Sequence, residues 1–134
     1  MFSDNLIQLR KLHHLSQEEL AEKLDVSRQT LSKWETGESM PDIGKCQLLA
    51  VLFEVTLDDL VNFESPVQGL GVPPKGKHVF GVVTVGDKGQ IVLPAKARKI
   101  FGIEAGDRLL ILGDEDRGIA ILPERDFFAQ FFRR

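Results

Sequence analysis

Apolar residues recur at a helical period across residues 16–37, and capping residues divide this stretch into two short helices. Ser16 is a natural N-cap, and Glu19, three residues later, completes a capping box. The apolar residues that this first helix would bury are Leu20, Ala21 and Leu24. Asp25 and Val26 then turn the chain, so the first helix is predicted to end after Leu24.

The second helix is predicted to begin at the N-cap Ser27, with Leu31 and Trp34 facing inward because they lie three residues apart. Its outward-facing residues are Arg28, Gln29, Ser32 and Lys33. Arg and Gln are side chains that read base edges in DNA. The pattern is therefore typical of a DNA-binding helix-turn-helix, although a plain helical bundle would show the same caps and spacings. The same spacing favours a core role for Trp34 over base stacking.

Residues 6–60 as a whole resemble the Cro/Xre-type helix-turn-helix domain, which implies a five-helix bundle that binds DNA. The matching motifs, in chain order, are Leu6, Leu9-Arg10, Leu15-Ser16-Gln17, Leu20-Ala21, Val26-Ser27-Arg28-Gln29, Trp34-Glu35, Gly37, Pro41-Asp42, Leu49-Ala50, Phe53, Val55 and Leu57-Asp58. Two departures, His14 and Asp25, stand at turns where the family usually has glycine. Both residue types tolerate positive φ, so the turns remain accessible.

Arg28 and Gln29 are expected to meet base edges, because residues opening the second helix of a docked helix-turn-helix do so. Gln17 and Ser27, at the starts of the two helices, are expected to hold phosphates. The predicted set of DNA contacts is completed by Thr30, Ser32 and Lys33. The resemblance also implies a structural ion pair between Arg10 and Glu35, which would tie the third helix of the domain to the first.

A change of composition after residue 63 predicts a domain boundary. Residues 64–78 are rich in Pro and Gly and are interpreted as a linker between domains 1–63 and 79–134. Beyond the linker, residues 79–85 and 90–93 are predicted to be strands joined by a turn at 86–89. A short helix opens at Pro94 and ends at Gly102, and two further strands at 108–112 and 119–122 flank a polar turn.

Residues 79–124 resemble the SpoVT/AbrB swapped-hairpin family, through Gly89-Gln90-Ile91-Val92-Leu93-Pro94, Ala97-Arg98, Phe101-Gly102-Ile103 and Gly106-Asp107. A module of this size rarely buries enough surface alone, and its strands are apolar on both faces. We therefore expect an α+β chain whose second domain is a small β-rich swapped-hairpin dimer with one short helix. The expected dimerisation residues are Phe80, Val82, Val83, Val85, Ile91, Leu93, Leu110, Leu112, Ile119 and Ile121.

Many members of this second family bind DNA through arginines, but Val83 and Gln90 stand here where that pattern has cations. Arg98 and Lys99 are the remaining candidates for a secondary DNA contact. A role mainly in dimerisation is therefore favoured for this half. At the C-terminus, an amphipathic helical tail would cover the open end of the barrel, or form a tetramer contact or latch. Its apolar residues are Phe127, Phe128, Phe131 and Phe132.

Composition limits the remaining alternatives. The hydrophobic content of 43% is ordinary for a globular protein, and the longest apolar run, residues 48–53, is too short to span a membrane. With no secretory signal pattern, a cytoplasmic location is expected. The single cysteine, Cys46, has helical spacing from Ile43 and Leu49 and is interpreted as a core residue. No metal-ligand spacing or cofactor motif is recognised.

Charge is unevenly distributed between the two halves. Residues 1–63 contain 6 Lys and Arg against 11 Asp and Glu, whereas residues 64–134 contain 11 against 9. Because non-specific DNA affinity comes from neutralising phosphates, an acidic reading domain should bind weakly as a single copy. The sequence therefore predicts a double-stranded DNA-binding transcriptional regulator that acts as a homodimer, with a tetramer left open.

An antitoxin that binds a partner toxin is the main alternative, because both resemblances also extend to proteins of toxin-antitoxin operons. An enzyme is disfavoured, since no phosphate-binding loop, carboxylate pair or nucleophile with a nearby base is found.

Overall fold

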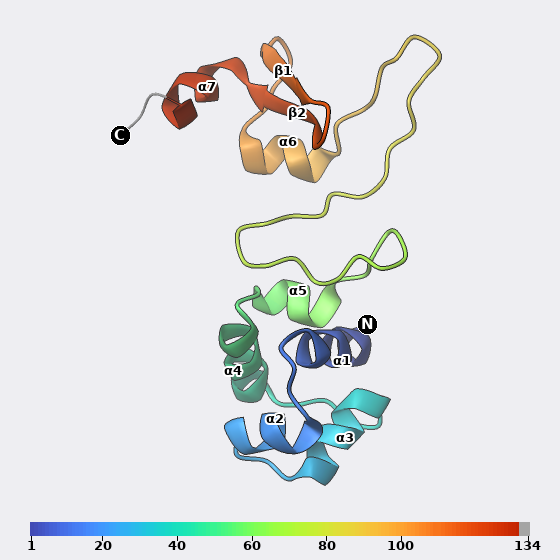
Figure 1. Cartoon of the computed structure of the whole chain (residues 1–134), viewed down its shortest axis with the longest axis vertical. Helices are drawn as coiled ribbons and strands as arrows, with labels where there is room; N and C mark the ends of the chain where they lie inside the picture. The colour runs from blue at the N-terminus through green and yellow to red at the C-terminus, as the bar shows by residue number, and fades with distance from the viewer. Residues whose placement is uncertain (132–134) are drawn as a thin grey trace. The chain divides into compact units, whose positions relative to one another are not determined.

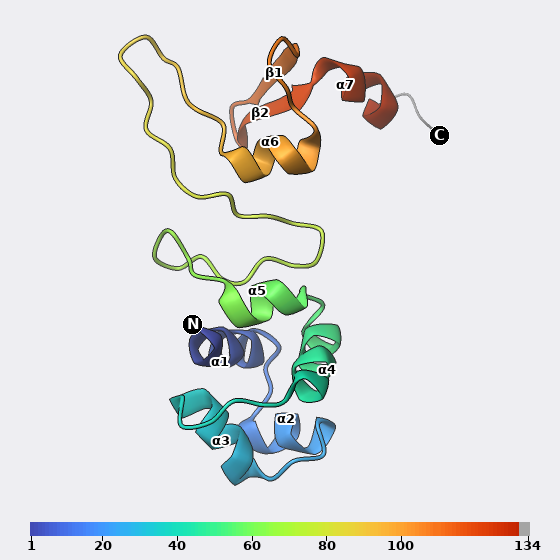
Figure 2. The ribbon, with the colours of Figure 1, turned by 180° about the vertical axis from the view of Figure 1, so that it is seen from behind.

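The computed structural model describes the backbone of residues 1–131 and the side chains of residues 1–127. The chain divides into two compact units, Met1–Val79 and Phe80–Arg134. The first is helical, and the second combines two helices with an antiparallel hairpin (Figures 1 and 2). The two-domain α+β architecture expected from the sequence is confirmed.

Five helices make up the first unit: α1 (Phe2–Leu12), α2 (Gln17–Lys23), α3 (Arg28–Thr36), α4 (Ile43–Phe53) and α5 (Leu57–Asn62). Each supplies leucines to one shared core, in which the largest fully buried side chains are Leu6, Leu9, Leu20, Leu31, Leu49 and Leu60. Trp34 joins this core, as its spacing predicted. The bundle therefore has a single hydrophobic centre contributed by all five helices.

Side-chain caps fix where four of these helices begin. Ser16, Ser27, Asp42 and Thr56 each accept a hydrogen bond from the backbone N–H three residues later. At α2 the reciprocal bond from Glu19 completes the predicted capping box. The backbone N–H and hydroxyl of Ser16 hold the pKa of that carboxyl below its ordinary value.

Turns between the helices use positive φ at three non-glycine residues. His14 and Asp25 have φ of 57° and 54°, which confirms that these residue types take the left-handed conformation here. Glu54, at the C-terminal end of α4, has φ of 56° and was not anticipated. Gly37 ends α3 with φ of 82°, a value that suits glycine because it has no Cβ.

A buried amide joins the two ends of the helical sequence. Asn5, which is 6% exposed, donates through Nδ2 to the carbonyl oxygens of Asp59, Leu60 and Phe63 at 3.3, 3.0 and 3.0 Å. Asp59 and Leu60 lie in the last turn of α5 and Phe63 is its C-cap, where carbonyls lack partners within the helix. The Asp59 carbonyl also accepts from the Phe63 N–H at 3.0 Å. The bond therefore closes the bundle by satisfying the end of α5 from α1.

Residues 64–79, which contain the predicted linker, form no helix or strand. They do not all project away from the bundle, however. Val72 is buried in the helical core, and Pro73 is buried beside it. The chain therefore turns back onto the first unit before it enters the second.

The second unit contains α6 (Ala95–Phe101), the antiparallel pair β1 (Leu109–Asp114) and β2 (Gly118–Pro123), and α7 (Glu124–Phe131). The hairpin register pairs Ile111 with Ile121 and Asp114 with Gly118. The two strands thus extend further into the predicted polar turn than expected. The C-terminal tail is helical up to residue 131, but the side chains of Phe128 and Phe131, and residue Phe132 altogether, lie outside what the structure describes.

The strands predicted at 79–85 and 90–93 are absent from the single chain, and that prediction is wrong for it. Only the turn between them forms, with the Gly86 N–H donating to the Gln90 carbonyl at 2.8 Å. A strand exists only when a neighbouring strand completes its hydrogen-bond ladder, and in the described part of this chain no strand pairs with these residues. We call residues 80–93 the arm.

Arg125 of α7 holds the end of α6. Its guanidinium donates to the carbonyl oxygens of Phe101 and Gly102 at 3.3 and 2.7 Å, and pairs with the Asp107 carboxylate at 3.3 Å. The backbone N–H of Glu104 holds the pKa of Asp107 below its usual range, and Arg125 contributes less to the same lowering. The described side chains of this unit bury little apolar surface together. The polar contacts of Arg125 are therefore a main link between α6 and α7.

Among residues 1–131, no helix combines the length and apolar character needed to cross a membrane.

Candidate nucleic-acid interface

Helices α2 and α3 pack against each other and form the helix-turn-helix predicted from residues 16–37. The residues that join them to the core are Leu20, Ala21, Leu24, Leu31 and Trp34, all of which are buried. Burial of one face of α3 leaves its other face to solvent. Arg28, Gln29 and Lys33 are exposed there, and Ser32 is half-buried.

This exposed face is slightly hollowed. A shallow cavity of about 300 Å³ is lined by Arg28, Gln29, Ser32, Lys33 and Glu38. Four of these residues were predicted from the sequence, and the structure brings them together. Glu38 was missed, because it follows the helix after Gly37 and belongs to no helical pattern. Its carboxylate adds an acceptor to a surface otherwise rich in donors.

Ser27 and Thr30 are occupied by the capping interaction. The Ser27 hydroxyl oxygen accepts from the Thr30 N–H at 3.1 Å, and the two hydroxyl groups lie 2.9 Å apart. A phosphate contact by these residues would therefore have to coexist with the cap. The start of α3 is firmly held, which fixes the backbone that carries Arg28 and Gln29.

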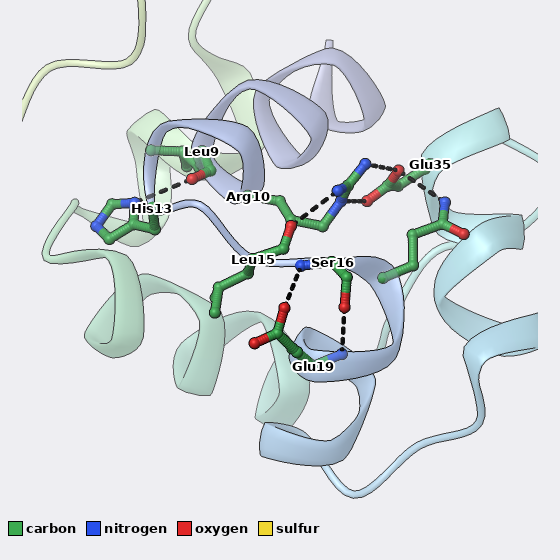
Figure 3. Close-up of polar contacts among 8 residues, drawn as sticks. Leu9, Arg10, His13, Leu15, Ser16, Glu19 and Glu35 are labelled. Carbon is green, nitrogen blue, oxygen red and sulfur yellow. Dashed lines mark hydrogen bonds and ion pairs between the residues drawn. The ribbon is translucent and has the colours of Figure 1, made fainter.

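Arg10, Glu35 and Gln17 form a polar cluster between α1, α2 and α3 (Figure 3). The Arg10 guanidinium contacts the two carboxylate oxygens of Glu35 at 2.6 and 3.1 Å and donates to the Leu15 carbonyl at 2.9 Å. The Arg10 and Glu35 side chains are only 13% and 6% exposed. Nearly full burial and a two-pronged geometry make this pair a structural tie between helices.

Gln17 departs from the simple role predicted for it. Its amide nitrogen donates to Glu35 Oε1 at 3.0 Å, so it completes the cluster from the start of α2. Sequence reasoning placed Gln17 at the DNA surface only. The structure adds a second task, since any phosphate held by Gln17 would be linked through one carboxylate to Arg10.

The remaining candidate DNA contacts, Arg98 and Lys99, are exposed on α6 of the second unit. Arg98 Nε donates to the Leu93 carbonyl at 3.2 Å, so part of its guanidinium is used to hold the end of the arm. Both cations border a shallow cavity that also includes Glu104.

The predicted dimerisation residues are largely uncovered. In the arm, Val82 and Val85 are 68% and 65% exposed, and on the hairpin Ile119 is 77% exposed. Among the side chains of residues 80–127, only Ala97 and Pro123 are buried. A separate cavity of about 280 Å³ is lined by apolar residues such as Phe80, Leu93 and Ile121. Within its described side chains, this unit taken alone has almost no hydrophobic core.

Cys46 lies away from these surfaces and is buried, as its spacing predicted. Its thiol faces the Pro41 carbonyl at 3.8 Å, and burial raises its pKa. A buried thiol with a raised pKa is a poor nucleophile and a poor metal ligand. Within residues 1–131, no group of three or more His, Cys, Asp or Glu side chains is arranged to hold a metal ion.

Comparison with known proteins agrees with this geometry. The profile of the family described as helix-turn-helix matches residues 6–60. Over 55 residues the chain is 42% identical to an uncharacterised HTH-type transcriptional regulator, MJ0272, of Methanocaldococcus jannaschii, covering 41% of this chain and 83% of that protein. The chain belongs to the helix-turn-helix family.

This helix-turn-helix protein is also 43% identical over 63 residues to the HTH-type transcriptional activator BcrR of Enterococcus faecalis. That similarity covers 47% of the chain and 31% of BcrR, so the chain spans about a third of the length of this relative. A crystal structure of a transcriptional regulator from Listeria innocua is 36% identical, with a TM-score of 0.46, over 52% of this chain and 64% of that one.

The second unit of the helix-turn-helix protein matches another family. The profile described as antidote-toxin recognition MazE, bacterial antitoxin, matches residues 82–128. The expected fusion of a Cro/Xre-type domain to an AbrB-like domain is thereby confirmed.

Proposed function

We propose that the protein is a sequence-specific double-stranded DNA-binding transcriptional regulator that acts as a homodimer in the cytoplasm. The observation that carries this proposal is the division of α3 into two faces. Leu31 and Trp34 are buried against the bundle, whereas Arg28, Gln29 and Lys33 are exposed on the opposite face. A helix held from one side and polar on the other can enter the major groove of B-DNA.

The side chains on that face have distinct chemistry. Arg28 can donate two hydrogen bonds to guanine, and Gln29 can donate to and accept from adenine, so both can read bases. Lys33 provides charge for the phosphate backbone, and Ser32 can donate or accept. Gln17 and Ser27 are proposed to contact phosphates from the ends of their helices, in addition to the structural bonds that they already make.

Dimerisation is supported by what the second unit fails to bury. The first unit has fifteen buried hydrophobic residues in its core. Among the described side chains of the second unit, only Ala97 and Pro123 are buried. An isolated unit of this kind is too poor in buried apolar surface to be stable. Pairing of the arm with a second copy would provide the missing strand ladder and cover Val82 and Val85.

The proposal predicts that Arg28→Ala and Gln29→Ala each weaken binding to the preferred site by about 1 to 3 kcal/mol. Each change should also relax the preference at one or two base positions, because a base-reading side chain has been lost. Binding-site selection with the full chain would identify the site, and fluorescence anisotropy would give the affinities of both variants.

Two further variants separate base reading from general charge. Lys33→Ala should weaken all sequences by a similar factor and reduce the salt dependence of binding. Lys11→Ala removes an exposed cation from α1 and should leave affinity and preference unchanged. If Arg28→Ala and Gln29→Ala both kept the wild-type preference, α3 would not be the reading helix.

An antitoxin is the second candidate, and the MazE match over residues 82–128 favours it. In that case the second unit would bind a protein toxin while the helix-turn-helix represses its own operon. Co-expression with the product of an adjacent gene would test this. A complex that forms through residues 80–134 and restores the growth of cells expressing the adjacent gene would support the antitoxin role. If those cells grew normally without this chain, the adjacent product would not be a toxin and the antitoxin role would be excluded.

A further inference from the structure

Part of the segment that connects α5 to the second unit is docked on the helical bundle. We call residues 70–75 the strap. Val72, in its middle, is 6% exposed and belongs to the core of the first unit. Its backbone N–H donates to Oε1 of Gln8, on α1, at 3.1 Å. The strap is therefore held by both a buried side chain and a hydrogen bond to a residue far away in the sequence.

Three other features favour docking of the strap. The Lys75 N–H donates at 2.8 Å to the carbonyl of Glu54, the residue with positive φ that ends α4. At Gly71 a Cβ atom would lie 2.5 Å from Nε2 of Gln8, so any larger residue would displace that side chain. The two prolines after Val72 restrict the backbone to extended conformations, which lowers the entropy lost on docking.

Docking shortens the connection between the units. With the strap in place, residues 76–79 alone separate Lys75 from the second unit. A flexible chain of four residues has a mean span of about 11 Å. If the strap were released, the connection would consist of residues 64–79, and its mean span would be about 22 Å.

We propose that the strap makes the spacing of the two half-sites part of what the protein recognises. This inference rests on the proposed function, in which a dimer reads two half-sites. Short tethers hold both reading units near one separation, and half-sites at another spacing or on another side of the duplex would be reached with difficulty. Released tethers would tolerate more spacings, but at a lower effective concentration of the second reading unit.

Tether length sets the size of the expected effect. Effective concentration falls roughly as the power −3/2 of the length of a tether that is long enough to span its sites. Sixteen residues in place of four would lower it about eightfold. Releasing the strap should thus weaken binding at the best spacing by about eightfold. The ratio between the affinities at poor spacings and at the best spacing should rise.

The test uses the full chain and a series of operators in which the two half-sites, first identified by binding-site selection, are separated by 0 to 10 additional base pairs. Val72→Asp places a charge in the core position and should release the strap. Val67→Asp is the matched control, because Val67 is 48% exposed in the same segment. A third variant inserts twelve Gly and Ser residues after Gly76, which lengthens the tether without touching the strap.

Wild type and Val67→Asp should share one sharp spacing optimum, and an operator lengthened by five base pairs should bind at least about tenfold more weakly, since this rotates one half-site by half a turn. Val72→Asp and the insertion should both flatten this profile. If the insertion left the profile unchanged, tether length would not control spacing and the proposal would be overturned. A Val72→Asp profile as sharp as wild type would overturn it as well.

Hydrogen exchange of the Val72 and Lys75 amides in the full wild-type chain gives an independent readout. Both should be protected, because both are donors to the bundle. Exchange at unprotected rates would overturn docking of the strap, whatever the DNA results. Protected amides in a chain that selects no DNA sequence would instead overturn the proposed function, and the spacing role with it, while docking itself would stand.

Discussion

Glu35→Ala should lower the free energy of unfolding of the helical unit by about 3 kcal/mol. The substitution leaves the guanidinium of Arg10 buried at 13% exposure with one remaining acceptor, the Leu15 carbonyl, and it removes the partner of Gln17. Uncompensated burial of a charge is the reason for the large effect. For a unit of this size, 3 kcal/mol corresponds to a fall in the melting temperature of at least about 12 °C.

Urea unfolding followed by tryptophan fluorescence would measure this change. Trp34 is the single tryptophan of the chain and is buried in the same unit, so its emission reports on the helical bundle alone. Glu18→Ala removes an exposed carboxylate from α2 and should unfold at the wild-type urea concentration. An unchanged midpoint for Glu35→Ala would show that the pair contributes nothing to stability.

The helix-turn-helix could be predicted from the sequence because its signals are local. Ser16 and Ser27 cap their helices through residues only three positions away, and inward-facing Leu31 and Trp34 follow from helical periodicity. Glu38 escaped prediction because it lies beyond the end of α3, in a stretch without periodicity. Its position beside Arg28 depends on how the chain turns at Gly37.

The strap could not be predicted, because the contacts that hold it are not local in the sequence. Pro and Gly around Val72 are typical of a linker, and nothing local indicates that the valine is buried. What holds this segment is Gln8, 64 residues away, and Glu54. Composition reports the conformational freedom of a segment, whereas docking depends on contacts that are distant in the sequence.

The missing strands of the arm illustrate a third limit. Apolar residues at 79–85 and 90–93 predict strands correctly only if a neighbouring strand exists, because pairing and not propensity creates a sheet. The single chain shows the turn at 86–90 without the ladder. The sequence pattern therefore shows that this segment needs a partner strand, and the structure of one chain contains no such partner within its described residues.

Charged residues in the arm should separate the proposed dimer. A chain with both Val82→Asp and Ile91→Asp is expected to sediment as a monomer, because four carboxylates would have to be buried in one dimer interface. Affinity for the complete operator should fall by a factor of about 10² or more, since binding of the second reading unit would no longer be intramolecular. The base preference of α3 should survive, because Arg28 and Gln29 lie in the other unit.

The unfolding curve followed by Trp34 fluorescence shows, for the same variant, whether the reading unit remains folded. Val67→Asp introduces a carboxylate on an exposed valine outside the arm and should remain dimeric with wild-type affinity. A double variant that still sedimented as a dimer would remove the arm from the interface. One that became monomeric but bound the operator as tightly as wild type would show instead that a single reading unit suffices, and that the acidic balance of residues 1–63 is no obstacle to tight binding.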